Sequence, residues 1–204
     1  MSDSYDNFIK QSNLKGRGYA DGYNASHFMG LTATELCDVK KILKHKALEG
    51  DTIAINGIRY LTTDEALDLL NQVLDSTVVL SDATAQASYE AYLLSKDHKY
   101  IDQLFDQLAG KESSDRWLAV QLLCSINFGS QWNSDVENQF SQLLLQETDE
   151  VLTHSLAKKM LDEMKITRGT SLYKNLIHKL ISSQIEVRKN SLYILKNNQI
   201  NVTN

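Results

Sequence analysis

The sequence contains no proline among its 204 residues. Helices can therefore run without kinks, and turns must rely on glycine, asparagine, aspartate and serine. Long hydrophobic runs are missing as well: no stretch approaches about 18 consecutive apolar residues, so we expect no transmembrane helix. Residues 1–6 are acidic and polar and lack the basic region and apolar run of a secretory signal. These absences predict a cytoplasmic protein that does not enter membranes.

Cysteine and histidine are few and scattered. Cys37 and Cys124 have no CxxC partner, and we expect both to be reduced and buried. No two of the five histidines stand at the three- or four-residue spacing that grips zinc, although His154 has acidic neighbours. The glycine-rich residues 16–23 lack a preceding strand and a Gly-Lys-Ser/Thr ending. We therefore predict no catalytic residue, no cofactor and no metal site.

Positive charge is scarce in the middle of the chain. The whole chain has a formal charge of -5, but residues 64–163 hold 18 acidic and 6 basic residues, a net charge of -12. Residues 164–204 hold 7 basic residues and one acidic residue, a net charge of +6. The acidic block is either a solvated surface or a surface suited to a basic partner. It opposes binding to nucleic acid and to anionic membranes.

The first third of the chain combines one clear helix with a predicted hairpin. Thr32 and Glu35 have the spacing of a capping box, and apolar residues then repeat at helical intervals as far as Leu48. Residues 52–55 and 58–61 are β-prone and flank Asn56-Gly57, a dipeptide typical of a type I′ hairpin turn. We expect residues 1–62 to form an N-terminal cap of irregular segment, helix and β-hairpin. Residues 63–204 would form a helical-repeat domain.

A 36-residue period runs through the second half of the chain. The small residues Ala119, Ser155 and Ser191 are 36 positions apart, and so are the apolar residues that follow them, Val120, Leu156 and Leu192. Each set lies in a helical pattern after a short polar break. Such a period is typical of stacked helix pairs, and the short breaks predict antiparallel neighbours.

These repeats resemble a known family. Residues 185–195 read Ile, Glu, Val, Arg and then a small residue and leucine, which resembles the second helix of a HEAT-type repeat; residues 115–123 and 149–156 match in part. The proline of the family's first helix is absent. The resemblance implies a HEAT-like α-solenoid, whose second helices, beginning at Asp115, Asp149 and Glu186, line a concave partner-binding surface. The predicted fold is mainly α, with stacked antiparallel helix pairs and one small N-terminal β-hairpin.

The small size, acidity and lack of proline are also similar to those of immunity proteins in bacterial toxin–immunity systems, including those of the contact-dependent inhibition type. That resemblance implies a non-enzymatic antitoxin that covers the active site of a basic, nuclease-like toxin. Carboxylates would compete with phosphates for the toxin's lysines and arginines, and aromatic residues would supply the buried centre. The candidate partner-binding carboxylates are Asp115, Asp149, Glu150, Asp162 and Glu163, and the candidate anchors are Trp117 and Tyr89.

Other functions stay open. The carboxylate-rich middle could serve a helical metal-dependent hydrolase, and the stack could be a HEAT-like scaffold or adaptor protein. A nucleic-acid binder using the lysines of residues 40–46 or the basic tail ranks last, because the acidic block would repel the same ligand. Trp117 can be either a core residue or an exposed hot spot.

Overall fold

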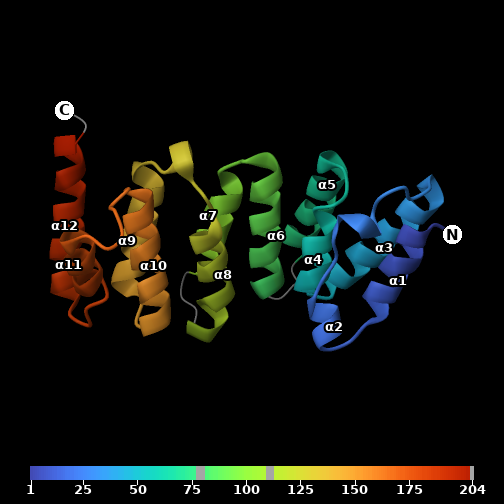
Figure 1. Cartoon of the computed structure of the whole chain (residues 1–204), viewed down its shortest axis with the longest axis horizontal. Coiled ribbons are helices and arrows are strands. Elements are labelled where there is room, and N and C mark those ends of the chain that lie inside the picture. Colours follow the sequence, from blue (N-terminus) through green and yellow to red (C-terminus); the bar gives the residue numbers. More distant parts are fainter. Residues whose placement is uncertain (77–80, 109–112, 203–204) are drawn as a thin grey trace. The chain divides into compact units, whose positions relative to one another are not determined.

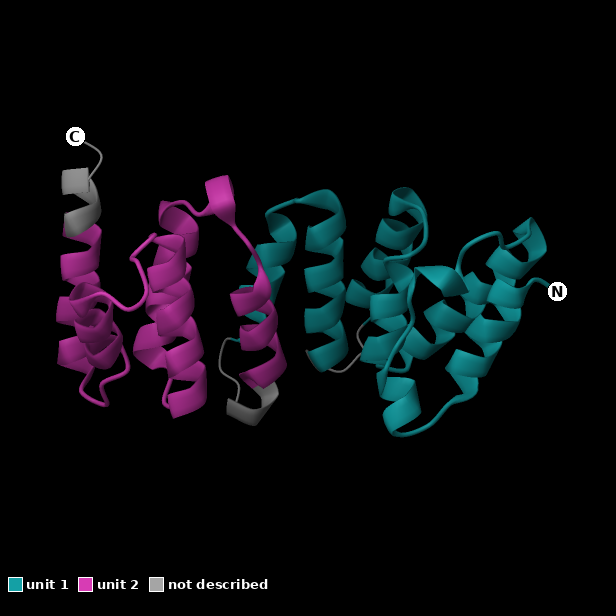
Figure 2. Ribbon diagram, in the orientation of Figure 1, with its two compact units in different colours: residues 1–109 teal, residues 110–204 magenta. Residues whose placement is uncertain are grey.

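The computed structural model describes residues 1–76, 81–108 and 113–202, and within these ranges it does not describe the side chains of residues 81, 113–115 and 198–202. The described residues form helices joined by turns and loops, with no strand among them (Figure 1). The mainly helical fold class is therefore confirmed. The chain divides into two compact units, residues 1–109 and 110–204 (Figure 2). Residue 62, the predicted domain boundary, lies between two helices of unit 1.

Unit 1 is built around its sixth helix. Its elements are α1 (Asp3–Asn13), α2 (Arg17–Ala20), the 3-10 turn η1 (Ala25–His27), α3 (Ala33–Leu48), α4 (Thr52–Ile58), α5 (Thr63–Leu74), α6 (Ser81–Ser95) and α7 (Lys99–Asp106). Helix α6 packs against α4, α5 and α7, while α3 packs against α4 and α5. The largest fully buried side chains of this unit are Phe8, Leu43, Ile55, Ile58, Leu70, Tyr92, Ile101 and Leu104.

Unit 2 is built around α10. Its elements are α8 (Ser113–Ser125), the 3-10 turn η2 (Gly129–Gln131), α9 (Ser134–Gln146), α10 (Glu150–Glu163), α11 (Ser171–Leu180) and α12 (Ile185–Val202). Helix α10 packs against α8, α9 and α11, whereas α12 packs against α9 and α11. The HEAT resemblance implies that α12 is the neighbour of α10 in the stack. In the structure, α10 instead packs against α11.

The repeated apolar positions lie in the core of unit 2. Val120 in α8, Leu156 in α10 and Leu192 in α12 are all buried. Of the small residues before them, Ala119 and Ser191 are buried and Ser155 is half-buried. The 36-residue period therefore marks the inward-facing positions of alternate helices.

The predicted β-hairpin is wrong, because residues 52–58 form helix α4. The Asp51 carboxylate accepts hydrogen bonds from the Ile53 amide (2.9 Å) and the Ala54 amide (3.0 Å) and so starts the helix. A helix also buries Ala54, Ile55 and Ile58 together. This burial outweighs the β-propensity of the segment and the turn preference of Asn56-Gly57.

Gly57 has a packing role in α4. A β-carbon built at Gly57 would lie 2.7 Å from Tyr23 Cδ2 and 3.0 Å from Leu43 Cδ2. The absence of a side chain therefore lets α4 approach Tyr23 and α3 closely, and the backbone needs no left-handed conformation here.

The predicted capping box at the start of α3 is confirmed. Thr32 Oγ1 accepts a hydrogen bond from the Glu35 amide (3.3 Å), and Glu35 Oε2 accepts one from the Thr32 amide (2.9 Å). The same carboxylate accepts bonds from the amide and hydroxyl of Ser2, which ties α1 to α3. Bonds from the Thr32 amide and then the Ser2 amide lower the pKa of Glu35 to about 2.

Candidate protein-binding surface

Helix α10 presents one side to the core and the other to solvent. The Asp149 carboxylate starts it by accepting hydrogen bonds from the Val151 amide (2.9 Å) and the Leu152 amide (3.0 Å). Leu152 is buried, as are the core residues that follow it at helical spacing, Leu156, Met160 and Leu161. Val151, His154 and Lys158 lie on the exposed side. Val151 is 63% exposed, which is unusual for a large apolar residue.

An open groove lies at the start of α10. Glu150, Val151, His154 and Ser155 line it together with Ile181, which directly follows α11. Its volume is about 520 Å³. Glu150 is exposed, and its carboxylate forms no ion pair with any described residue. The groove therefore combines two apolar side chains, Val151 and Ile181, with the polar side chains of His154 and Ser155 and the negative charge of Glu150.

A buried polar network holds this end of α10 in place. Arg116 of α8 donates from Nη2 to Glu147 Oε1 (2.8 Å), and the same oxygen accepts bonds from the amides of Thr148 and Asp149. Arg188 of α12 donates from Nη1 to the carbonyl oxygens of Glu147 (2.7 Å) and Leu144 (2.8 Å). Glu147 and Arg188 are both buried. The network joins α8, the end of α9 and α12 at the residues that precede α10.

Trp117 stands beside this network on α8. It follows Arg116 in the chain, and its side chain is 54% exposed. Trp117 is therefore not a core residue, and its role as a binding hot spot stays a prediction. Because α8 packs against α10, two large exposed apolar side chains, Trp117 and Val151, are carried by neighbouring helices.

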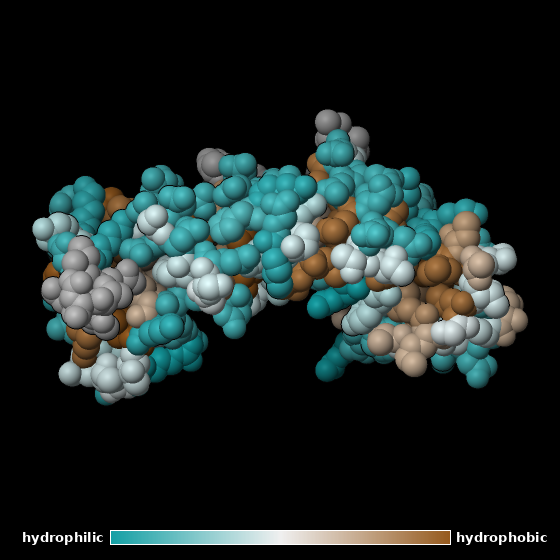
Figure 3. All heavy atoms as spheres, turned by 90° about the horizontal axis from the view of Figure 1, so that it is seen from above, coloured by the Kyte–Doolittle hydropathy of each residue, from teal (hydrophilic) through white to brown (hydrophobic). Residues whose placement is uncertain are grey.

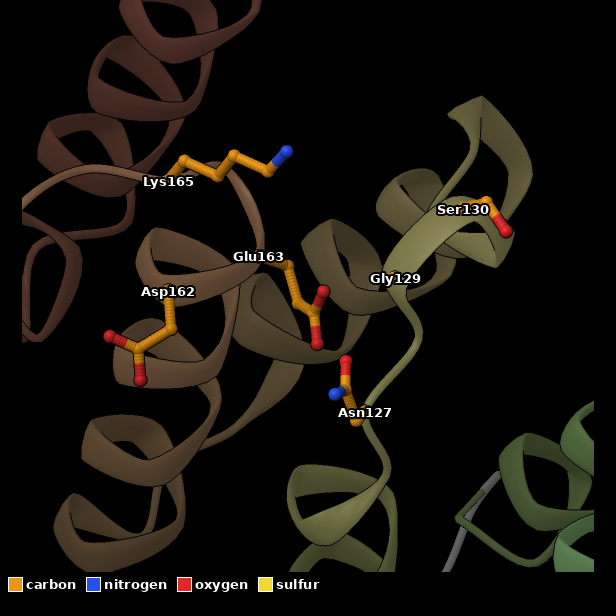
Figure 4. A pocket seen from close by; sticks show the side chains of 6 residues that line it. All are labelled: Asn127, Gly129, Ser130, Asp162, Glu163 and Lys165. Atoms are coloured by element: carbon orange, nitrogen blue, oxygen red, sulfur yellow. The ribbon is translucent and has the colours of Figure 1, made fainter.

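The other end of α10 carries Asp162 and Glu163, which line a second pocket of about 580 Å³ (Figure 4). Arg168 Nε donates to Asp162 Oδ1 (2.8 Å), and Arg168 Nη2 donates to Asp162 Oδ2. This pairing lowers the pKa of Asp162. The Glu163 carboxylate, which points toward Asn127 in Figure 4, accepts bonds from Lys159 Nζ (2.6 Å) and the Phe128 amide (3.3 Å). Both negative charges are thus compensated within the chain.

The predicted site residues are distributed as follows. Asp149 and Glu150 lie at the groove, and Trp117 belongs to α8, which Arg116 joins to the same end of α10. Asp162 and Glu163 lie at the opposite end of the 14-residue helix α10. Tyr89 lies half-buried in α6 of unit 1. Asp115 is in α8, but its side chain is outside the described part of the chain.

Sequence reasoning did not single out Ile181 and Glu147, and it treated Val151 as an ordinary residue of the helical pattern. The 36-residue period places Val151 level with Asp115 and with Val187, so it gives no consistent signal that the position faces solvent. No local signal marks Ile181 either, because its place in the groove depends on how α11 packs against α10.

Unit 1 carries a second acidic surface that the predicted site does not include. Residues 64–106, which span α5 to α7, hold nine acidic and two basic residues. Asp64, Asp75, Asp82 and Asp106 are exposed and form no ion pair with a described residue. Unit 1 has 16 acidic and 10 basic residues, a net charge of -6, whereas unit 2 has 10 and 11, a net charge of +1. Hydrophilic residues cover most of the face shown in Figure 3, with hydrophobic surface between them.

The remaining candidate chemistry is sparse. No group of three or more histidine, cysteine, aspartate or glutamate residues able to hold a metal ion occurs among the described residues. The expected burial of both cysteines is wrong for Cys37, which is exposed on α3. Burial raises the pKa of the Cys124 thiol to about 12, although the positive charge of Lys159 opposes the shift. No helix in the described residues is long and apolar enough to cross a membrane.

No family model, no curated protein and no solved structure matches this chain.

Proposed function

We propose that this chain is a non-enzymatic protein-binding module that contacts its partner with the start of α10 and the adjacent part of α8. The observation that carries the proposal is the exposure of two large apolar side chains: Val151 (63%), which lines the open groove, and Trp117 (54%), which is on the neighbouring helix α8. Binding hot spots combine exposed anchors of this kind with a support that does not need to be ordered on binding. The buried bonds of Arg116, Glu147 and Arg188 provide such a support.

More specifically, we propose that the chain is an immunity protein that neutralises a basic, nuclease-like bacterial toxin in the cytoplasm by covering its active site. Glu150 beside the groove would meet a lysine or arginine of the toxin that otherwise binds phosphate. Support comes from the formal charge of -5 and from the exposed carboxylate of Glu150, which has no ion-pair partner among the described residues. Complementary charge of this kind speeds association and excludes acidic competitors.

The predicted carboxylates are not equally available to pair with a partner. Asp162 and Glu163 are compensated by Arg168 and Lys159, so each would have to lose an internal partner before it could pair with a toxin side chain. Asp149 is used in capping α10. Glu150 is therefore the strongest electrostatic candidate among the four predicted carboxylates whose side chains the structure describes.

The test is capture of a partner from the native host, followed by titration with the purified partner. Wild type is compared with the double variant Trp117→Ala/Val151→Asp, and with Met29→Ala as the control, since Met29 is a 68% exposed apolar residue of unit 1 that belongs to no proposed contact. The double variant should bind at least about tenfold more weakly, which corresponds to about 1.4 kcal/mol. The control should bind like wild type.

Two results would count against the proposal. Equal affinity of wild type and the double variant would remove the start of α10 from the interface. A captured partner that is acidic, or whose nuclease activity is unaffected by the bound chain, would remove the immunity function and leave only a general binding module.

A further inference from the structure

The last helix pair of unit 2 has exposed apolar residues on a basic surface. Tyr193 of α12 is 70% exposed, and Leu172, Ile185 and Ile194 are each more than 40% exposed. Of the seven basic residues among residues 164–204, Arg188 is buried and Arg168 and Lys189 form ion pairs, which leaves Lys165, Lys174, Lys179 and Lys196 exposed. Lys174 and Lys179 of α11 are exposed and form no ion pair with a described residue. We call these six residues the basic surface: Leu172, Lys174, Lys179, Ile185, Tyr193 and Ile194.

The packing of α12 does not account for its exposed apolar residues. Arg188, Ser191, Leu192 and Leu195 are buried on the side of α12 that meets α9 and α11. The outward side of a surface helix is normally polar, because apolar side chains gain nothing from solvent. Tyr193 and Ile194 break this rule at neighbouring positions. Apolar residues grouped on an outward side indicate a binding surface.

The chemistry of the basic surface favours a protein over a nucleic acid. Lysines can contact phosphates and a tyrosine can stack on a base, but Leu172, Ile185 and Ile194 contribute little to binding a nucleic acid. An acidic protein surface can use both kinds of group, since carboxylates pair with the lysines while its own apolar atoms cover Tyr193 and Ile194.

The chain itself carries an acidic surface with the required charge. Of the nine acidic residues among residues 64–106, Glu90 is buried and Glu65 pairs with Lys40, whereas Asp64, Asp75, Asp82 and Asp106 are exposed without ion-pair partners among the described residues. We propose that the chain self-associates, with the basic surface of one copy docking on the α5–α7 surface of a second copy. The occupant of the exposed side of α12 is then another copy of this chain.

Two different surfaces meet in this contact, so the association is heterologous. A heterologous contact leaves one free surface of each kind at the ends of the assembly, and further copies can add until a ring closes. The contact uses none of the groove residues at the start of α10. Failure of this inference therefore leaves the proposed function intact, and the reverse also holds.

The experiment is sedimentation analysis of the purified full chain over a range of concentrations, at about 0.05 M and about 0.5 M salt. At low salt, the mean mass of the wild type should rise with protein concentration. At high salt, the mean mass at the same protein concentration should be lower, because salt screens ion pairs at an exposed interface. A wild-type chain that stays monomeric at low salt and high concentration overturns the inference.

Two charge-reversal variants locate the contact. Lys174→Glu/Lys179→Glu reverses the basic surface, and Asp75→Lys/Asp106→Lys reverses two sites at helix C-termini, where a lysine is favourable for the helix. Each variant alone should self-associate at least tenfold more weakly than the wild type. A mixture of the two should associate again, because the unchanged basic surface of one variant meets the unchanged acidic surface of the other, and the two reversed surfaces also complement one another. Circular dichroism confirms that each variant is folded.

The matched control is Lys15→Glu/Lys44→Glu, which changes the net charge equally at two exposed lysines of unit 1. This control should associate like wild type. Association that persists in both reversal variants, or that is lost equally in the control, overturns the proposed contact. So does a mixture that fails to associate.

A single-stranded oligonucleotide of about 20 nucleotides tests the alternative that the basic surface binds nucleic acid. If the wild type binds this probe at physiological salt and Lys174→Glu/Lys179→Glu does not, while neither self-associates, the basic surface is a nucleic-acid site. That result overturns the inference. Self-association without oligonucleotide binding supports it.

Discussion

Glu90 is a buried acid in the middle of unit 1. It is 1% exposed, Gln86 Nε2 donates to its Oε1 (3.0 Å), and Arg59 Nε lies 3.6 Å from its Oε2. Burial raises the pKa of Glu90 to about 7, although the charge of Arg59 and the bond from Gln86 both oppose the shift. The folded state therefore holds a proton more tightly at this carboxyl than the unfolded state does.

The free energy of unfolding should consequently depend on pH through Glu90. The unfolded-state pKa is near the ordinary value of 4.5, so folding binds a proton between that value and about 7. Stability from this group should fall as pH rises through that window and level off above it. Glu90→Gln should remove this slope and be the more stable protein at about pH 8, by up to about 3 kcal/mol. Urea unfolding at about pH 5 and about pH 8 measures both effects. Parallel pH profiles for wild type and variant would contradict the prediction.

Asp149 combines a structural role with a predicted binding role. Its carboxylate caps α10 through the amides of Val151 and Leu152. Asparagine caps a helix about as well as aspartate, whereas alanine does not, so Asp149→Ala should lower the free energy of unfolding by about 1 kcal/mol. Asp149→Asn should change it by only a few tenths of a kcal/mol. Chemical denaturation measures the difference, and Asp149→Asn is then the suitable variant for testing charge in partner binding.

At the scale of the element, substitutions in α4 can distinguish a helix from a hairpin at residues 52–58. In a type I′ turn Asn56 has a positive φ, and Asn56→Ala would be strained. In α4 Asn56 is exposed and helical, so Asn56→Ala should be neutral or slightly stabilising. Gly57→Ala should cost about 1–3 kcal/mol, because its β-carbon meets Tyr23 and Leu43. Thermal unfolding of both variants checks this; a destabilised Asn56→Ala would contradict the helix.

The junction of α8, α9 and α12 depends on Arg188. Its guanidinium satisfies two carbonyl oxygens at the end of α9 and is buried. Arg188→Ala leaves these oxygens without their donor, so it should lower the free energy of unfolding by about 3 kcal/mol. The neighbouring Lys189→Ala is the control, because Lys189 is exposed and pairs only with Glu186 on the surface. A loss for Lys189→Ala as large as that for Arg188→Ala would contradict the role of the network.

At the scale of the whole molecule, a charged side chain should affect partner binding most where it is exposed and has no ion-pair partner. Glu150→Lys places a positive charge beside the groove, whereas Glu186→Lys changes an exposed carboxylate that already pairs with Lys189. For a basic partner, Glu150→Lys should slow association and weaken its salt dependence, while Glu186→Lys should have little effect. Stopped-flow or surface-binding kinetics at two salt concentrations measure the rates. The opposite ranking of the two variants would move the binding surface away from α10.

Much of the fold could be predicted from local pattern. The cap at Thr32, the start of α10 at Asp149 and the inward positions of the 36-residue period all follow from residues near one another in the sequence. The charge compensation at Glu163 could also have been anticipated, since Lys159 stands four residues earlier on the same helix. The candidate site was less accessible to such reasoning, because exposure of Val151 and Trp117 depends on neighbouring helices.

The sequence by itself determined that the chain is helical, where most helices begin, which repeated residues enter the core, and how charge is divided along the chain. Only the tertiary structure decided that residues 52–58 are a helix, because burial of Ala54, Ile55 and Ile58 overrides local turn and strand preferences. It also decided that Glu147, a residue with no distinguishing local pattern, joins Arg116 and Arg188, 31 and 41 residues away. Such contacts depend on which helices pack together, and no local spacing encodes that choice.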